Sequence, residues 1–407
     1  MTIRFTTAGE SHGQALVGIL EGIPAGLELL AEHVNVQLAR RQHGYGRGRR
    51  MQIEQDAVEF LAGVRAGETT GAPIALLIRN RDWQNWRDIM DPAPSVSDGA
   101  ALSEAKGLRK RAVTRVRPGH ADLTGLLKYD REDARDILER ASARETTARV
   151  AIGAVCRTLL AAFDVRVGSH VVELGDIVAR RPEPFPDDIN AAADGSPLRT
   201  LDAEAERRMI ERIDAIKREG NTLGGVCEVV AHGVCVGLGS HTAWDTKLDG
   251  RIGRAMLSIP AVKGVEIGMG FAAARATGAA VHDEIEPAPG NARTGGVRRR
   301  SNRAGGLEGG MTTGEPIVVR VAMKPISTLM QPLATIDVAT GAPAEATAER
   351  SDVTAVPAMG VIAEAMLAIV LTEALLEKFG GDSLRETKRN HDGYLSHLKD
   401  RLVDRSR

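Results

Sequence analysis

The chain has 407 residues, with 53 basic and 54 acidic side chains, so its formal net charge is −1. Hydrophobic residues make up 43% of it, which is enough to bury a core and excludes global disorder. A net charge near zero argues against a general nucleic-acid binder, because such proteins carry a basic surplus. Ten lysines leave 43 arginines in the basic class. An arginine-rich genome explains this bias as well as a site that holds planar anions does.

The cysteines, the N-terminus and the longest apolar stretch all bear on where the protein is located. Cys156, Cys227 and Cys235 form no CxxC pair, which fits a reducing cytosol and gives no zinc-site spacing. The N-terminus lacks a basic segment followed by an apolar one, so we expect no secretion. The long apolar stretch 358–376 contains two glutamates and is typical of a buried helix. These features predict a soluble, cytoplasmic protein that does not enter a membrane.

Hydrophobic periodicity predicts strands and helices without a regular βα alternation. The expected elements are, in chain order, a strand at Ile3–Thr6, helices at 29–41, 143–163 and 203–218, strands at 226–236 and 317–323, and a last major helix from Pro357 to Gly380-Gly381. This mixture favours an α+β fold over a doubly wound sheet. Because no linker separates parts of the chain, we expect one large domain over residues 1–390 and a polar C-terminal tail over 391–407.

The first candidate site follows the first strand directly, in the sequence Gly9-Glu10-Ser11-His12-Gly13. Glycines permit a sharp turn, and His12 is a group that exchanges a proton near neutral pH. An ordinary exposed turn is the alternative.

A second candidate is the Gly/Arg segment at residues 40–50, which has five arginines and follows a predicted helix. Guanidinium groups and flexible backbone N–H groups together make an anion-binding loop. The segment is not a P-loop, because GxxxxGK[ST] is absent. A flexible loop that contacts RNA is the alternative reading.

Two further segments combine arginine, histidine and small residues. Residues 115–122 read RVRPGHAD, in which a Pro-Gly turn presents His120 beside Arg117. Residues 139–145 read ERASARE at the expected start of a helix, where small residues let a phosphate approach the positive helix end. A capped helix with surface ion pairs is the simpler interpretation.

Three further candidate segments lie late in the chain. Residues 301–310 are rich in glycine, and KPIST at 324–328 ends a strand with a cation and hydroxyls. Arg350-Ser351-Asp352 precedes the last major helix.

Two other patterns are weak. Residues 268–273 match GxGxxA, which would suit a dinucleotide-dependent dehydrogenase only within a βαβ unit. His282-Asp283-Glu284 has no further ligand at a recognisable spacing, so we predict a surface turn and no metal site.

Taken together, these segments closely resemble chorismate synthase, in order from about Thr6 to Asn390. The resemblance rests on GESHG at 9–13, RRQHGYGRGRR at 40–50, RPGHAD at 117–122, ERASARET at 139–146, RSNRAGGLEGGM at 300–311, KPIST at 324–328 and RSD at 350–352. It implies conversion of 5-enolpyruvylshikimate 3-phosphate to chorismate by 1,4-anti elimination of phosphate, the last common step of the shikimate pathway. It also implies a carbon–oxygen lyase with reduced FMN as cofactor, and an α+β layered sandwich in which two central β-sheets are flanked by helices.

The resemblance assigns roles to particular residues. His12 is placed near the leaving phosphate, His120 near the flavin ring, and Asp352 assists proton removal through the flavin. Flavin-contact positions are Arg140, Ala141, Ser142, Ala261, Gly309, Lys324, Pro325, Ile326, Ser327, Thr328 and Arg350. Arg41 and Arg47 match nicotinamide-phosphate contacts and are expected to touch substrate as well, and further substrate-binding candidates are Arg50, Arg117 and Arg144.

The chain departs from the family's usual sequence at one position, and the resemblance also implies an assembly and a source of reductant. The family usually has Asn or Gln where this chain has Pro260; proline lacks an N–H and a side-chain amide, so a polar flavin contact from this position is in doubt, while Ala261 is expected to pack on the ring. The resemblance further implies a homotetramer and NADPH as the source of reductant. We expect an external flavin reductase, because no separate reductase domain is recognisable.

Overall fold

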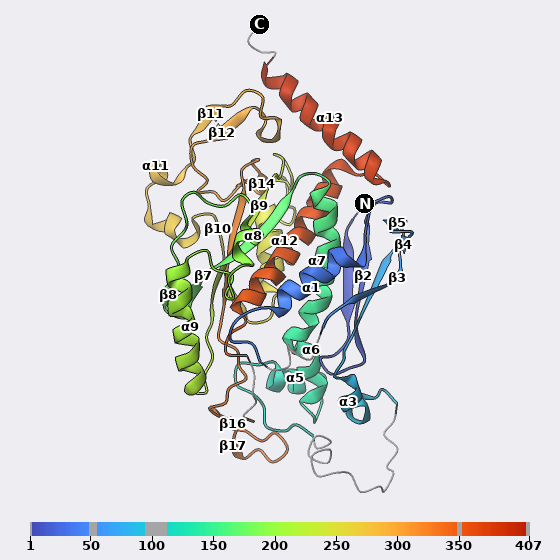
Figure 1. Ribbon diagram of the computed structural model, residues 1–407, viewed down its shortest axis with the longest axis vertical. Helices are drawn as coiled ribbons and strands as arrows, with labels where there is room; N and C mark the ends of the chain where they lie inside the picture. Colours follow the sequence, from blue (N-terminus) through green and yellow to red (C-terminus); the bar gives the residue numbers. More distant parts are fainter. Residues whose placement is uncertain (1, 49–54, 94–111, 348–351, 404–407) are drawn as a thin grey trace.

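The computed structural model describes residues 2–48, 55–93, 112–347 and 352–403. Two antiparallel sheets form its outer layers (Figure 1). The four-stranded sheet has the order β1 (Arg4–Ala8), β2 (Ala15–Glu21), β6 (Ile74–Arg79) and β3 (Val58–Ala62). The five-stranded sheet has the order β10 (Val262–Ile267), β15 (Ile317–Met323), β9 (Gly225–His232), β7 (Arg166–Leu174) and β8 (Ile177–Val178).

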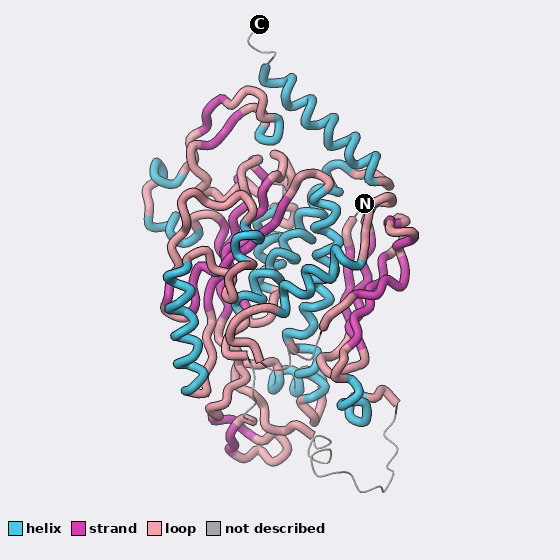
Figure 2. The backbone as a smooth tube through the Cα atoms, in the orientation of Figure 1, coloured by secondary structure: helices cyan, strands magenta, loops and turns pink. Residues whose placement is uncertain are grey.

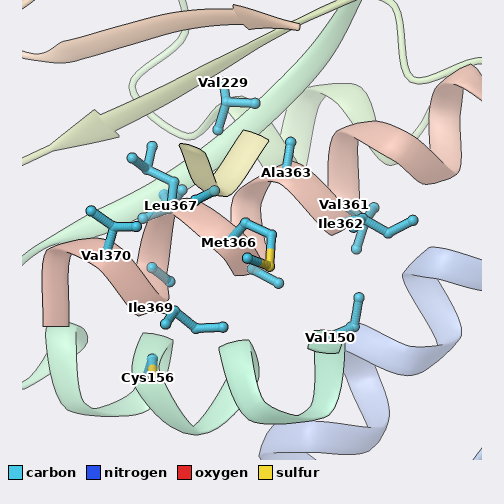
Figure 3. Close-up of a cluster of buried hydrophobic side chains, with 14 of the residues drawn as sticks. Val150, Cys156, Val229, Val361, Ile362, Ala363, Met366, Leu367, Ile369 and Val370 are labelled. Atoms are coloured by element: carbon cyan, nitrogen blue, oxygen red, sulfur yellow. The ribbon is translucent and has the colours of Figure 1, made fainter. Parts of the chain in front are cut away.

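Helices fill the space between the two sheets, as Figure 2 shows in cyan. The inner helices are α1 (Ala31–Gln42), α7 (Thr146–Ala161) and α12 (Val356–Phe379). Helix α7 packs against β2 and β6, and α12 packs against β7 and β9. In Figure 3, α12 lies between α7, which carries Val150 and Cys156, and the strand that carries Val229. The core therefore lies within the helical layer and on both of its faces.

Close backbone approach holds α7 against α12. A Cβ at Gly153 would lie 2.4 Å from the Cβ of Ala365, so only glycine fits there. Helix α12 is long and apolar enough to span a membrane, yet 94% of its apolar window is buried inside the protein. The helix is apolar over its whole length because it lies between two sheets, where every side of it contacts protein.

One carboxylate lies deep in this apolar layer. Glu364 of α12 accepts two hydrogen bonds of 2.9 Å from Arg40, one of 2.7 Å from Arg157 and one of 3.1 Å from Arg199. The Ser169 hydroxyl donates a further bond of 2.6 Å. Burial opposes ionisation of this group, but the arginines outweigh it and lower the pKa of Glu364 to about 2. The ion cluster joins α1, α7, α12 and β7 at one point.

Smaller elements surround these layers. They are the helices α3 (Trp83–Met90), α5 (Asp122–Tyr129), α6 (Arg135–Ala141), α8 (Ile189–Ala193), α9 (Ala203–Arg218), α10 (Leu248–Leu257), α11 (Gly278–Val281) and α13 (Leu384–Val403), and the 3-10 turns η1 (Ala143–Glu145), η2 (Gly270–Arg275) and η3 (Ala292–Thr294). The remaining strands pair as β4 (Val64–Arg65) with β5 (Glu68–Thr69), β11 (Ile285–Pro287) with β12 (Val297–Arg299), β13 (Leu307–Glu308) with β14 (Met311–Thr312), and β16 (Ala334–Ile336) with β17 (Pro343–Glu345).

The α+β class, the two layered sheets and the single domain are confirmed, but the expected order of layers is wrong. The main helices α1, α7 and α12 lie between the two sheets and do not flank a central pair of sheets. The physical reason is that α7 and α12 are apolar on nearly every side, so they are stable only with sheets on both faces of the helical layer.

Most expected elements are confirmed, with altered ends. The helix at 203–218 and the strand at 317–323 have the bounds predicted. The strand expected over 226–236 stops at His232, because Gly233 turns the chain with a φ of +81°. The helix expected from residue 143 begins at Thr146, after the 3-10 turn η1. Helix α13 was not foreseen; it continues across residue 390, and its His391 packs edge-on against Phe163 and Phe379.

Candidate active site

The turn that carries His12 joins β1 to β2. Gly9 enters it with a φ of +106°, and a Cβ there would lie 2.3 Å from the carbonyl oxygen of Ala15. Only glycine fits such a position. Ser11 is buried, whereas the side chain of His12 is 20% exposed. The turn therefore anchors itself through Ser11 and presents the imidazole at the surface of the site.

The imidazole of His12 is bound by Glu139, a residue that was assigned no role from the sequence. The carboxylate accepts the backbone N–H of His12 at 2.8 Å and contacts ring Nδ1 at 2.8 Å. On one face of the ring lies Trp86 of α3, with the ring centroids 3.9 Å apart and the planes 22° from parallel. The sequence signal for Glu139 was its place at the head of the ERASARET segment, next to an arginine already singled out.

The end of α6 binds the same turn through two further residues. Arg140 donates to the carbonyl of Gly9 at 3.1 Å and to the carbonyl of Thr7 at 2.9 Å. Ser142 donates its hydroxyl to that of Ser11 at 3.2 Å. The structure thus brings 139–142 and the 9–13 turn together, and the guanidinium of Arg140 holds the turn.

Arg144 lies inside the protein beneath this turn. Its guanidinium donates to the side-chain oxygen of Asn80 at 2.8 and 3.0 Å and to Asp56 at 2.8 Å. The amide of Asn80 in turn donates to the carbonyls of Glu10 and Gly13. With its side chain only 3% exposed, Arg144 supports the turn from within.

Arg41 joins this group from the end of α1. It donates to the hydroxyl of Thr146 at 3.0 Å and to the carbonyl of Ala143 at 2.8 Å. Its third nitrogen, Nη1, is buried without a hydrogen-bond partner among the residues that the structure describes. Burial lowers the pKa of Arg41 to about 9, with the positive charges of Arg144 and Arg47 acting in the same direction.

Arg47 and Asp352, which lie far apart in the sequence, meet near Arg41. The Nε of Arg47 lies 3.2 Å from Oδ2 of Asp352, and the backbone N–H of Gly48 donates to Oδ1 at 2.5 Å. The predicted residues Arg50 and Arg350 lie outside the described residues. Two of the predicted arginines and the predicted aspartate are therefore neighbours.

A second group forms around His120 at the start of α5. Gly119 turns with a φ of +76°, and the Nδ1 of His120 lies 2.5 Å from Oδ1 of Asp122. Arg117 donates to the same carboxylate at 2.8 Å. Burial opposes ionisation of Asp122, but the hydrogen bonds from His120 and Arg117 outweigh it and lower its pKa. Asp122 is a second buried carboxylate that binds a candidate histidine and that the sequence reasoning missed.

The KPIST segment lies against this second group. Lys324 donates from Nζ to the carbonyl of Gly119 at 3.0 Å, and burial lowers the pKa of Lys324. The backbone N–H of Lys324 donates to the carbonyl of Ala261 at 2.9 Å, where Ala261 has a φ of +68°. A Cβ built on Gly119 would lie 3.6 Å from that of Ser327. The predicted flavin-contact positions 261, 324 and 327 are therefore close together.

The two groups lie at the same end of the protein, with α5 packed on α6 (Figure 1). Gly309 does not belong to either group, because it connects β13 and β14 toward the opposite end of the protein. A Cβ built on Gly309 would meet nothing within 4 Å among the described residues.

The alternative readings lose their support here. A strand does precede the 268–273 glycines, but β10 runs antiparallel to β15 and a 3-10 turn follows it, so the βαβ unit of a dinucleotide site is absent. In the Gly/Arg segment, Arg40 and Arg41 belong to α1 and are directed into the protein, which leaves them unsuited to RNA. Asp283 accepts from Ser301 and from the backbone N–H of Ala304, which is the role of a turn residue.

Comparisons with known proteins agree on one family. A family model described as chorismate synthase matches residues 3–376. A chorismate synthase of Trichlorobacter lovleyi is 55% identical over 402 residues, covering 98% of this chain and 100% of the relative. One of Salinispora tropica is 54% identical, covering 97% and 99%. A crystal structure of a chorismate synthase matches with a TM-score of 0.74 and 44% identity, covering 98% of this chain and 99% of the other.

Proposed function

Because the chain belongs to the chorismate synthase family, we propose that His12, Arg41, Arg47, His120 and Asp352 carry that family's reaction. The reaction is the 1,4-anti elimination of phosphate from 5-enolpyruvylshikimate 3-phosphate, which yields chorismate. The enzyme is thus a lyase that acts on a phosphate ester and serves the shikimate pathway.

The observation that supports this assignment most directly is Nη1 of Arg41, which is buried and has no hydrogen-bond partner in the part of the chain that the structure describes. A buried N–H without an acceptor is costly, and an anion is the acceptor that suits a guanidinium. The substrate carries two carboxylates and a phosphate, about −4 in total if the phosphate is mostly dianionic. Arg41 and Arg47 would then bind its anionic groups.

The two histidines have separate tasks in this proposal. His12 donates a proton or a hydrogen bond to the leaving phosphate, a task for which imidazole is suited near neutral pH. His120 lies beside the KPIST segment, where it would control the protonation state of the flavin. Asp352 assists removal of the proton that leaves the substrate ring, with Arg47 and the N–H of Gly48 fixing the carboxylate.

Reduced FMN is the proposed cofactor, and when bound it supplies the electron that makes cleavage of the carbon–oxygen bond easy and recovers it afterwards. The residues fit such a group in part. Lys324, the turn at Ala261 and Ser327 form one surface beside His120, whereas the Arg140 guanidinium is engaged with the turn of residues 7–9. We therefore assign the 324–328 segment and Ala261 as its main contacts.

The proposal extends to the cellular setting. We expect a cytoplasmic homotetramer that receives reduced flavin from an external reductase, with NADPH as the source of electrons. Light scattering of the purified protein measures the assembly, and an NADPH oxidation assay with oxidised FMN measures any reductase activity of its own.

The test of the reaction is an anaerobic assay with 5-enolpyruvylshikimate 3-phosphate and chemically reduced FMN, in which chorismate and phosphate are both measured. We expect equal amounts of the two products and no net oxidation of the flavin. Omission of FMN and use of oxidised FMN are the controls. Absence of chorismate from a folded protein under the complete conditions would refute the proposed function.

A further inference from the structure

We propose that Glu139 is a positioning residue that acts through His12, and that Trp86 covers the ring which Glu139 fixes. The proposal rests on the function proposed above, and it adds two residues to the group that serves the reaction. Neither touches the reacting atoms in this scheme: Glu139 is 2% exposed in its side chain and lies behind the imidazole, which is 20% exposed.

The carboxylate of Glu139 determines which ring nitrogen of His12 is available. Its two oxygens lie 2.8 and 3.0 Å from Nδ1, and one of them also accepts the backbone N–H of His12 at 2.8 Å. With Nδ1–H bound to a carboxylate, the proton that exchanges with a ligand is the one on Nε2. Nε2 has no hydrogen-bond partner in the described part of the chain, so it is the nitrogen left for the leaving phosphate.

The carboxylate is itself immobile relative to the turn. The backbone carbonyl of Glu139 accepts the N–H of Ser11 at 2.9 Å. The next residue, Arg140, holds Gly9 and Thr7. The main chain of Glu139 therefore binds Ser11, and its side chain binds His12. The ring of His12 cannot turn without breaking its contacts to this fixed carboxylate.

Trp86 restricts the ring from another side. Its indole lies nearly parallel to the imidazole at 3.9 Å, and its N–H donates at 3.0 Å to Asp82, the residue directly before α3. Aromatic stacking of this kind fixes a ring plane. The carboxylate and the indole together leave the Nε2 edge as the open side of His12.

The second histidine has a different environment, which makes the assignment specific. Asp122 binds the Nδ1 of His120, but Arg117 shares that carboxylate and also lies 3.1 Å from Nδ1. Among the described residues, no arginine shares the carboxylate of Glu139. Glu139 is thus dedicated to His12, and its removal is expected to act on that histidine alone.

A double-mutant cycle tests whether Glu139 acts through His12. Glu139→Gln should lower kcat by about 10- to 100-fold, part of the factor that a positioned acid or base contributes, and should leave KM within about threefold. In a His12→Ala background the same change should have no further effect, because the group it positions is gone. Glu145→Gln is the matched control, since Glu145 is a buried carboxylate of the same segment that pairs with Arg149; it should retain wild-type kcat.

Equal losses from Glu139→Gln in both backgrounds would mean general damage to the fold and would overturn the proposal, as would an unchanged kcat in the wild-type background. A second measurement does not depend on activity. Tryptophan emission is quenched by an imidazole stacked on the indole, so His12→Ala should raise the emission of Trp86, and Glu139→Ala should approach that higher level. Trp86→Phe identifies the share of the emission that belongs to this residue.

An emission for Glu139→Ala equal to wild type, or no change in His12→Ala, would overturn the positioning role whatever the assay shows. Failure of the unmodified protein to form chorismate would instead refute the proposed function, and the emission result would still decide whether Glu139 holds His12. The two failures are therefore distinguishable.

Discussion

The ion cluster around Glu364 makes the stability of the helical layer depend on one carboxylate. Replacement by glutamine keeps the size of the side chain but removes the charge that faces Arg40, Arg157 and Arg199. Asp194 would still pair with Arg40 and Arg199, but the three guanidinium groups would lose the buried carboxylate that all of them contact. We expect Glu364→Gln to destabilise the protein without changing its fold.

The magnitude follows from the pKa. A fall from 4.5 to about 2 corresponds, at about 1.4 kcal/mol for each pKa unit, to about 3 kcal/mol of stability at neutral pH. Removing one partner of a buried ion pair costs about 3–5 kcal/mol, which agrees. Because the folded pKa is the lower one, this stability is present above about pH 4.5 and is lost as the pH falls toward 2.

The assay is urea unfolding followed by circular dichroism at pH 7 and at pH 4, with Glu373→Gln as the control. Glu373 is on the same helix but half-buried, and burial raises its pKa, so its charge contributes no comparable stability. We expect a large drop in the unfolding midpoint for Glu364→Gln at pH 7 and a small change for Glu373→Gln. Equal midpoints for the two variants would refute the reasoning.

Three other outcomes follow from the structure. Gly153→Ala should destabilise the protein by about 1–3 kcal/mol through overpacking against Ala365, and thermal unfolding measures this; a wild-type melting temperature would contradict it. Asp122→Asn should lower kcat more than it lowers binding of substrate, because His120 loses the carboxylate on Nδ1; steady-state kinetics separate the two, and a change in KM alone would count against it. The thiols should resist a disulfide reagent at pH 8 until the protein unfolds, since burial raises the pKa of each, to about 12 for Cys156 and Cys227 and about 11 for Cys235; rapid labelling of the native protein would show the burial to be wrong.

The sequence by itself determined the elements whose patterns are local. Helix α9 combines an amphipathic period with an Asp202 cap that accepts two backbone N–H groups, and both signals can be read from the order of residues. The strand at 317–323 alternates buried and partly exposed residues, which predicts one buried face. The motifs likewise identified the family, because several of them are long and specific to it.

Only the tertiary structure decided the order of the layers and the partners of the site residues. A helix that is apolar on nearly every side, such as α12, reads the same whether it lies inside or outside a pair of sheets, so its place depends on what packs on each face. Glu139 and His12 are 127 positions apart, and no local pattern links them. Arg144 and Arg140 read as ligands for anions, yet their guanidinium groups are taken up by Asp56 and by the carbonyls of the turn. Whether an arginine binds a ligand or the protein is decided by the acceptors that folding brings within reach, and these come from distant parts of the chain.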